Sequence, residues 1–428
     1  MSRKTKTTAT KEEARPALVP KLRFPEFRGA EGWEQVPLGQ LADRVTARNL
    51  EGDCTRVLTN SAERGVLDQR DYFEKDIATA GNLEGYYVVN RGDYVYNPRI
   101  SNVAPVGPIS RNNIGQGVMS PLYTVFRFKS KNTDFYSHYF KTTCWHSYLR
   151  QVASTGARHD RMSISIGDFV AMPLPVLSSA EQQKIAECLS SVDELMVAQA
   201  RKVDALKTHK KGLMQQLFPR EGETEPRLRF PEFQNAGEWA KDSMQGVFVF
   251  RQGLQVAIEH QFMEDGDGRE RFIRIIDVTQ NNEPPRYIAV TNNAYTLSVN
   301  DLFMIRYGTP GVVSIGYEGV IANNLFQLIF RIQEIHSPFF WYYFLQTKYE
   351  EISGLSGSSS MPAISFKTLN NIGVEYPSLP EQKRIASCLT SLDALIAAET
   401  QKLDALKTHK KGLMQQLFPS VGGVAGEA

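Results

Sequence analysis

Arginine, histidine and asparagine side chains gather in two short segments of the first half of the chain. Residues 97–102 read Asn-Pro-Arg-Ile-Ser-Asn, and residues 154–161 read Ser-Thr-Gly-Ala-Arg-His-Asp-Arg. Glycine, proline and other small residues indicate loops, which can approach another surface closely. These polar side chains suit base edges and phosphates, although an ordinary solvated turn can hold them as well. The residues that we expect to make such contacts are Asn97, Arg99, Asn102, Arg158, His159 and Arg161.

A matching pair of segments occurs in the second half of the chain. Residues 306–310 read Arg-Tyr-Gly-Thr-Pro, and residues 356–361 read Ser-Gly-Ser-Ser-Ser-Met. Hydroxyl groups can serve backbone or base contacts with lower specificity than guanidinium groups. The candidates in this half are Arg306, Tyr307, Thr309, Ser358, Ser359 and Lys367.

Signatures of catalysis are absent from the sequence. It has no GxxxxGK[ST] phosphate loop, no HExxH pair, and no glycine-rich cofactor loop combined with an Asn/Asp-Pro-Pro-aromatic tetrapeptide. Glu381 and Lys383 supply half of a nuclease motif, but they open a predicted helix. The cysteines form no CxxC pair, so neither a zinc site nor a disulfide framework is indicated. We expect a chain that is not an enzyme and has no cofactor or metal.

The elements that position these loops include a long internal repeat. Residues 204–219 recur without a change as residues 404–419, an offset of 200. A second repeat precedes the first, because Leu-Arg-Phe-Pro-Glu-Phe ends both 21–27 and 227–233, which we call the lead-in segments. The blocks between the repeats are much less alike. This arrangement indicates a duplicated protein with one constant framework and two variable parts.

Each repeat predicts one long helix. Ser178 and Glu181 have the Ser-x-x-Glu spacing of a capping box, and Pro219 ends the segment. The second copy has the same features 200 residues later. About 38 residues at ~1.5 Å each make a rod of roughly 57 Å, which needs a partner along its apolar stripe. We expect the two helices to pack antiparallel on each other, although they could also be duplicated core elements with no task beyond stability. The stripe includes Ile185, Leu189, Val192, Leu195, Val203 and Leu206, with Leu395 and others in the second copy.

The two variable blocks, 21–177 and 227–377, predict a common α+β fold. Both contain short β-type runs separated by turn signals, such as 123–128 and 325–330. An aromatic-rich helical stretch then follows in each block, from Phe135 to Leu149 in the first. The fold class is therefore α+β, with two similar domains joined by two long antiparallel helices that form an intramolecular coiled coil with pseudo-two-fold symmetry.

Charge leaves the kind of partner open. The first block has 19 basic and 16 acidic residues, whereas the second has 12 basic and 16 acidic residues. An acidic block counts against nucleic-acid binding, since phosphate neutralisation supplies much of the affinity. A cluster of Arg269, Arg271 and Arg274 weakens that objection.

Hydropathy predicts a cytoplasmic chain without membrane contact. No run of 18 apolar residues occurs, and no apolar stretch follows the basic N-terminus. The predicted organisation is a disordered tail at 1–20, a first recognition domain at 21–177, a long helix at 178–219, a linker at 220–226, a second recognition domain at 227–377, a second long helix at 378–419, and a flexible tail at 420–428.

The repeated motifs resemble those of the DNA specificity subunits of type I restriction–modification systems. The resemblance rests on Leu379–Ala386, on its counterpart Ala180–Ala186, on the Leu-Met-Gln-Gln-Leu-Phe-Pro ends of both helices, and on the lead-in segments. Each motif is short, but their order is highly specific and covers nearly the whole chain.

This resemblance implies two target-recognition domains that each read one half of a bipartite, asymmetric site in double-stranded DNA. The helix pair would set the gap between the half-sites. It also implies two methyltransferase subunits docked on the helices and lead-in segments, and translocating endonuclease subunits that join for restriction. Adenine methylation would be the partner's chemistry. The alternative is a protein-only adaptor with two ligand-binding blocks on a coiled-coil spacer; an enzyme with unrecognised chemistry is a weaker third possibility.

Overall fold

The computed structural model describes residues 18–72, 83–154, 160–220, 222–280, 282–290, 295–356 and 362–419. The chain divides into two compact units, the first made of residues 1–198 and 403–428 and the second of residues 199–402. Each unit thus combines one variable block with the first half of the helix that follows it and the last half of the other long helix. Within the described ranges, no helix has both the length and the apolarity that a membrane span needs.

The repeats form two helices of 39 residues each, α5 (Ser179–Leu217) and α11 (Leu379–Leu417). Both helices end at the residues that the sequence predicts, within one or two positions. In the first unit, the start of α5 and the end of α11 share one hydrophobic core with the variable block, and the second unit repeats this with the helices exchanged. Long-range packing therefore anchors both ends of both helices.

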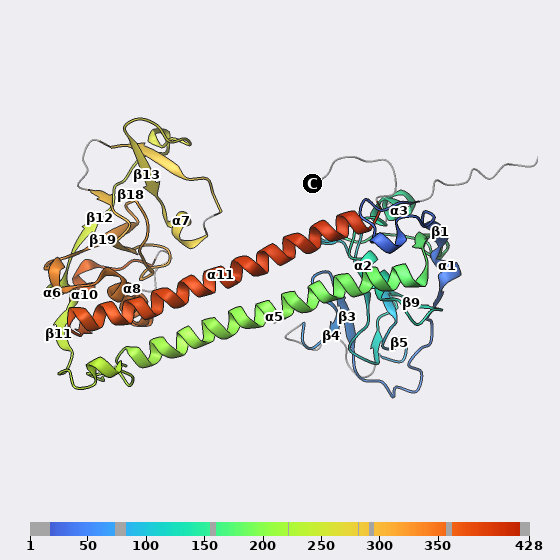
Figure 1. The fold of residues 1–428 in the computed structure, drawn as a ribbon, viewed down its shortest axis with the longest axis horizontal. Coiled ribbons are helices and arrows are strands. Elements are labelled where there is room, and N and C mark those ends of the chain that lie inside the picture. The colour runs from blue at the N-terminus through green and yellow to red at the C-terminus, as the bar shows by residue number, and fades with distance from the viewer. Residues whose placement is uncertain are drawn as a thin grey trace, which may run out of the picture. The chain divides into compact units, whose positions relative to one another are not determined.

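Within each unit, the parts of α5 and α11 that it contains lie side by side and run antiparallel (Figure 1). Asp193 of α5 forms an ion pair with Lys410 of α11 in the first unit. Asp393 of α11 forms one with Lys210 of α5 in the second unit, at 2.6 Å. Adding or subtracting 200, the offset of the repeat, converts one ion pair into the other. This is what an internal two-fold relation between the two copies requires. The predicted antiparallel pairing and fold class are confirmed.

The apolar stripe is narrower than the sequence suggests. Val192 and Val203 are buried, but the side chains of Leu195 and Leu395 are 55% and 43% exposed. Their assignment to the packed stripe is wrong. At about 100° per residue, Leu195 lies about 60° around the helix from Val192, and a two-helix contact buries only a narrow seam.

The capping-box prediction is half wrong. The Ser178 hydroxyl accepts a hydrogen bond from the Glu181 amide at 3.2 Å, as predicted. The Glu181 carboxylate does not return to the helix start. It accepts two bonds, at 2.7 and 2.8 Å, from the Arg23 guanidinium of the lead-in segment. Glu381 and Arg229 form the same pair in the second unit, because a long-range cation competes successfully with the local amide.

The lead-in segments also contact the end of the other helix. Each contains a short 3-10 helix, η1 (Pro25–Phe27) or η3 (Pro231–Phe233). The Leu22 amide donates to the Gln416 carbonyl of α11 at 2.9 Å, and the Leu228 amide donates to the Gln216 carbonyl of α5 at 2.9 Å. The lead-in segment of each unit thus contacts the start of one long helix and the end of the other. These three repeated parts form the same composite surface in both units.

The central sheet has the same strand order in both units. In the first unit the order is β2-β9-β6-β7, and in the second it is β12-β19-β16-β17. A two-stranded antiparallel sheet next to the long helices closes each variable block, β1-β10 in the first unit and β11-β20 in the second. The strands are β1 (Glu34–Pro37), β2 (Ala42–Arg44), β6 (Tyr94–Tyr96), β7 (Ile109–Arg111), β9 (Thr124–Phe128), β10 (Pro173–Val176), β11 (Ala240–Ser243), β12 (Phe248–Gln252), β16 (Leu302–Ile305), β17 (Val313–Ser314), β19 (Leu325–Phe330) and β20 (Gly373–Tyr376).

The remaining strands differ between the units. The first unit has the pairs β3-β4 and β5-β8, whereas the second has the four-stranded sheet β14-β13-β18-β15. These strands are β3 (Leu58–Ser61), β4 (Gly65–Asp68), β5 (Tyr87–Val89), β8 (Gly117–Met119), β13 (Arg269–Ile273), β14 (Arg286–Ala289), β15 (Thr296–Leu297) and β18 (Gly319–Ile321).

Short helices connect the strands in both units. The predicted helical stretch from Phe135 to Leu149 is interrupted and forms two helices. The short helices are α1 (Leu38–Leu41), α2 (Asp134–Tyr139), α3 (His146–Val152), α4 (Ile166–Val170), α6 (Met244–Val247), η4 (Ile258–His260), α7 (Ile275–Thr279), η6 (Gln333–Ile335), α8 (Pro338–Thr347), α9 (Tyr349–Gly354) and α10 (Phe366–Leu369).

Candidate nucleic-acid interface

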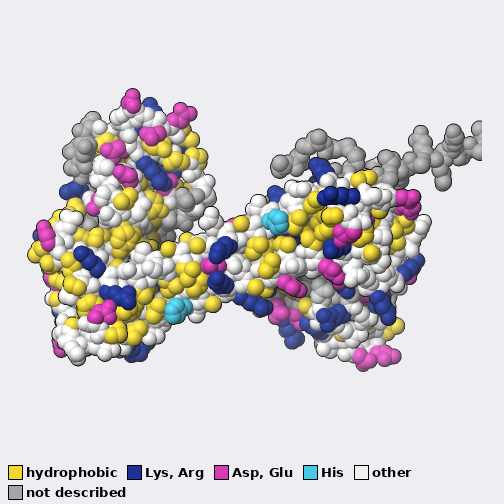
Figure 2. Space-filling view, viewed as in Figure 1, with side chains coloured by type: hydrophobic (Ala, Val, Ile, Leu, Met, Phe, Trp, Pro, Cys, Tyr) yellow, Lys and Arg dark blue, Asp and Glu magenta, His cyan; other side chains and the backbone are white. Residues whose placement is uncertain are grey.

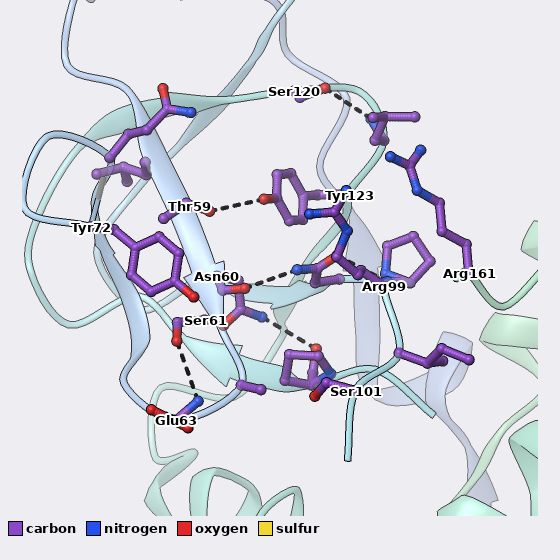
Figure 3. Close-up of a pocket in the computed structure, with 18 of the residues that line it drawn as sticks. Thr59, Asn60, Ser61, Glu63, Tyr72, Arg99, Ser101, Ser120, Tyr123 and Arg161 are labelled. Carbon is purple, nitrogen blue, oxygen red and sulfur yellow. Dashed lines mark hydrogen bonds between the residues drawn. The ribbon is translucent and has the colours of Figure 1, made fainter. Parts of the chain in front are cut away.

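A hollow of about 580 Å³ lies in the first unit beside the loop that follows β6. Figure 3 shows Arg99 and Arg161 on one side of this hollow and Tyr72 on the other. Between them, the Thr59 and Tyr123 hydroxyls are 3.0 Å apart and share a hydrogen bond. The wall comes from β3, from the loop 97–103, from the turn before β9 and from Arg161. Cationic, aromatic and hydroxyl groups therefore converge on one concave surface.

The two loops predicted from the sequence pair with each other by backbone hydrogen bonds. The Met162 amide donates to the Pro98 carbonyl at 2.9 Å, and the Ile100 amide donates to the Asp160 carbonyl at 3.0 Å. Asn97 holds the start of the first loop, because its amide group donates to the Asn60 carbonyl at 2.9 Å and accepts from the Arg99 amide at 3.0 Å. Asn97 thus shapes the loop that carries Arg99.

A glycine makes this loop geometry possible. Gly107 has φ of +80°, and a Cβ at this position would lie 2.1 Å from the Asn97 carbonyl oxygen. A side chain here would push the loop away from β7, so the position requires glycine.

The arginines of the first hollow are weakly held. Arg99 and Arg161 each lie 3.8 Å from the Asp160 carboxylate, and the Arg99 side chain is 61% exposed. Exposed ion pairs of this length contribute little energy. The Arg99 guanidinium can therefore turn toward a ligand at small cost, whereas the Arg161 side chain is 25% exposed and less free to move.

The second unit has a hollow of about 750 Å³ in the corresponding place, beside the loop that follows β16. Arg306 is fixed there: its Nη1 donates to Gln252 Oε1 at 2.6 Å, its Nε donates to the Ile364 carbonyl at 3.1 Å, and its guanidinium lies 4.6 Å from the Phe366 ring centre. These contacts make Arg306 a wall of the hollow. The residues that line it are Gln252, Gly253, Gln255, Ile275, Arg306, Tyr307, Gly308, Asn323 and Asn324.

Isolated backbone bridges show which residues of the two hollows are equivalent. The loop after β6 forms the bridge Arg99–Arg161, and the loop after β16 forms the bridge Tyr307–Ala363. Two arginines in the first unit are thus replaced by tyrosine and alanine in the second. The framework is shared, but the groups that it presents differ in chemistry.

The structure places the other predicted residues as follows. Asn102 is exposed on the loop of the first hollow, while Thr309 and Lys367 are exposed near the second without lining it. Four candidates lie outside the described residues: Arg158, His159, Ser358 and Ser359.

Several residues of the hollows were missed by sequence reasoning. They come from strands and turns far from the predicted loops, such as Thr59 in β3 and Gln255 after β12. Nothing in their local sequence marks them, because only the sheet order brings them to the loops.

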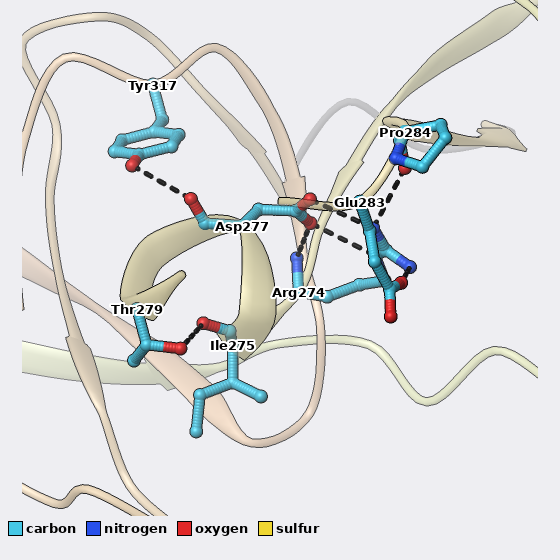
Figure 4. A network of polar contacts seen from close by, with 7 residues as sticks. All are labelled: Arg274, Ile275, Asp277, Thr279, Glu283, Pro284 and Tyr317. Atoms are coloured by element: carbon cyan, nitrogen blue, oxygen red, sulfur yellow. Dashed lines mark hydrogen bonds and ion pairs between the residues drawn. The ribbon is translucent and has the colours of Figure 1, made fainter. Parts of the chain in front are cut away.

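The arginine cluster near β13 is not a free basic patch. Arg274 donates to both carboxylate oxygens of Asp277, at 3.0 and 2.9 Å, and to Glu283 at 3.0 Å (Figure 4). Arg269 stacks on the Phe262 ring at 3.7 Å. The suggestion that this cluster offsets the acidic second block is wrong for Arg274, since carboxylates already neutralise it.

Basic and acidic side chains are interspersed on the face shown in Figure 2. Among the residues that the structure describes, no group of His, Cys, Asp and Glu is arranged to hold a metal ion.

Comparisons with known proteins fit this architecture. Residues 262–408 match the sequence model of the type I restriction modification DNA specificity domain. The specificity subunit of the type I restriction enzyme MjaVIII of Methanocaldococcus jannaschii is 26% identical over 323 residues, which cover 71% of this chain and 74% of that subunit.

Two solved structures share the fold. The type I restriction–modification S subunit from M. genitalium superposes with a TM-score of 0.57 at 15% identity, over 95% of this chain and all of that one. A chain from a type I restriction–modification system, solved to explain complex assembly and conformational transition, has a TM-score of 0.56 at 17% identity, over 91% of this chain and 98% of that one. The resemblance predicted from the sequence is confirmed.

Proposed function

We propose that this chain, which resembles the DNA specificity subunits of type I restriction–modification systems in sequence and fold, recognises a bipartite DNA site, with one half-site read by each unit. One observation carries this proposal. The same loop pairing builds a hollow in both units, yet Arg99 and Arg161 in the first are replaced by Tyr307 and Ala363 in the second. A shared framework with different reading groups suits an asymmetric target.

The first hollow fits contact with guanine and phosphate. Guanidinium groups donate to guanine O6 and N7 or to phosphate oxygens. Arg99 and Arg161 are only weakly paired with Asp160, so they are available for such contacts. The adjacent hydroxyls of Thr59 and Tyr123 add further polar groups on the same surface.

The helix pair would act as the spacer between half-sites. Both α5 and α11 are continuous over 39 residues, roughly 58 Å at 1.5 Å per residue. Half-sites about one turn apart, roughly 34 Å, can be reached from one face of a duplex. Shortening α5 and α11 by matched turns is expected to change the gap and to leave the half-sites unchanged.

The repeated surfaces would bind two methyltransferase subunits. Lead-in segment, helix start and helix end form the same composite surface in each unit, through the Arg23–Glu181 and Arg229–Glu381 pairs. Identical surfaces suit two copies of one partner. Methylation would then be the chemistry of that partner, and endonuclease subunits would join the same assembly.

A footprint of the full chain with its methyltransferase subunits tests the proposal. We expect protection of two separated half-sites. Arg99→Ala should weaken binding about 10- to 100-fold when the first half-site is intact, and scrambling that half-site should remove the difference. Arg91→Ala, an exposed arginine outside the hollow, is the matched control. One continuous footprint would refute the reading of two separate half-sites. Absence of salt-dependent DNA binding would instead favour the protein-only adaptor.

A further inference from the structure

We propose that the carboxamides of Asn323 and Gln255 read an adenine in the half-site of the second unit. This inference rests on the proposed function and deepens it, because it assigns a base to one of the two hollows. The residues stand 68 positions apart in the sequence and meet in the wall of the second hollow.

The two carboxamides form a pair on the surface. Asn323 Nδ2 donates to Gln255 Oε1 at 3.2 Å, and both side chains are exposed. Hydrogen bonds also fix the backbone below the pair. The Gln252 side chain donates to the Asn323 backbone carbonyl and accepts from Arg306. Arg306 in turn donates to the Ile364 carbonyl. A chain of bonds therefore holds the backbone of Asn323 in place before any ligand arrives.

The unused atoms of the pair match one base edge. Across the residues that the structure describes, the bond between Asn323 Nδ2 and Gln255 Oε1 leaves Gln255 Nε2 and Asn323 Oδ1 without a hydrogen-bond partner. They present one donor and one acceptor. If both amides were rotated by 180°, Asn323 Nδ2 and Gln255 Oε1 would present the same combination of one donor and one acceptor.

Adenine is the base that this combination fits. Its major-groove edge offers the N7 acceptor beside the N6 amino donor, and asparagine and glutamine pair with it on that basis. Guanine offers two acceptors at the same edge, so the acceptor of the amide pair would face another acceptor. Cytosine and thymine each offer only half of the pattern.

The amide pair is not part of the shared framework. The turn before β19 and the turn before β9 are closed by equivalent backbone hydrogen bonds. The Leu325 amide donates to the Ala322 carbonyl at 2.9 Å, and the Tyr123 amide donates to the Ser120 carbonyl at 3.0 Å. This equivalence puts Asn323 in the place of Pro121. Proline offers no polar side-chain group, so the first unit holds the same turn without the amide. The pair is a variable feature, as a reader of sequence should be.

The test is a binding assay on the full chain with its methyltransferase subunits and without methyl donor. Duplexes carry 7-deazaadenine, which lacks the N7 acceptor, at one adenine of the second half-site at a time. We expect one position to lower the affinity about 10-fold. Gln255→Ala and Asn323→Ala should each lose about 10- to 100-fold in discrimination against other bases at that same position. When a variant is assayed on the duplex with 7-deazaadenine at that position, the loss of affinity should be no greater than with either change alone, because both changes remove the same contact.

Asn371→Ala, an exposed asparagine of the same unit outside the hollow, should leave all values unchanged. Retained selectivity at the first half-site shows that each variant is folded. The inference is overturned if every second-half adenine tolerates the analogue, if that half-site contains no A·T pair, or if both substitutions preserve base selectivity. Absence of a second half-site altogether refutes the proposed function instead, so the two failures are distinguishable.

Discussion

Replacing Glu381 by alanine tests the link between the lead-in segment and the second long helix. The Glu381 carboxylate accepts from Arg229 Nε at 2.9 Å and from Nη2 at 2.7 Å. The side chains are only 2% and 8% exposed, respectively. Removing one partner of such a pair leaves a buried charge and costs about 3–5 kcal/mol. Arg229 keeps its bonds to the Ala236 and Gly237 carbonyls, so we expect the lower end, about 3 kcal/mol.

The matched control joins the same two elements at the surface. Arg384 of α11 pairs with Glu232 of the lead-in segment at 3.0 Å, and both side chains are 47% exposed. An exposed pair contributes at most about 1 kcal/mol. Arg384→Ala should therefore have a small effect on the free energy of unfolding, although it breaks a bond between the same two residue types.

Thermal unfolding of the full chain, followed by tryptophan fluorescence, measures the difference. Trp239, 2% exposed in the same core as the start of α11, reports on the second unit. For a unit of about 200 residues, 3 kcal/mol lowers the midpoint by roughly 6–12 °C, against about 2–4 °C or less for the control. Equal shifts for Glu381→Ala and Arg384→Ala would refute the argument from burial.

Three further predictions concern the helix pair and the first unit. Hydrogen bonds from a glutamine and two lysines lower the pKa of Glu399 to about 2. The ionised Glu399 carboxylate therefore stabilises the fold fully above its ordinary pKa of about 4.5, and this stabilisation is lost as pH falls toward 2. Glu399→Gln should flatten the acid side of a plot of unfolding free energy against pH. Burial lowers the pKa of His138 to about 4, so the first unit should lose stability as pH falls from about 6.5 to 4, and His138→Gln should remove that loss in a fluorescence-detected titration. Gly107→Ala should displace Asn97 at a local cost of about 1–3 kcal/mol, weakening the first half-site in a footprint while the second stays protected; equal weakening of both would contradict the assigned role of the loop.

Local patterns in the sequence predict the framework well. The long helices follow from apolar spacing and from a terminal proline, and strands such as Leu302–Ile305 and Leu325–Phe330 are found where alternation and turn signals place them. These features depend on backbone preferences within a few residues, which a single sequence displays directly.

Long-range competition explains the local predictions that failed. Glu181 has the spacing of a capping residue, but its carboxylate binds the Arg23 guanidinium, 158 positions away in the sequence. A charged partner of this kind forms a stronger hydrogen bond than the backbone amide at the helix start. Leu195 has the right residue type for the seam, but the partner helix covers a narrower strip than the pattern suggests.

By itself, the sequence determined the duplication, the helix pair and the places where the polar loops leave the strands, because repeats and periodicity are properties of neighbouring residues. Only the tertiary structure decided which side chains stand together in each hollow. Gln255 and Asn323 meet because β12 and β19 are neighbours in one sheet. Their proximity is set by strand order, which leaves no trace in the residues on either side of them.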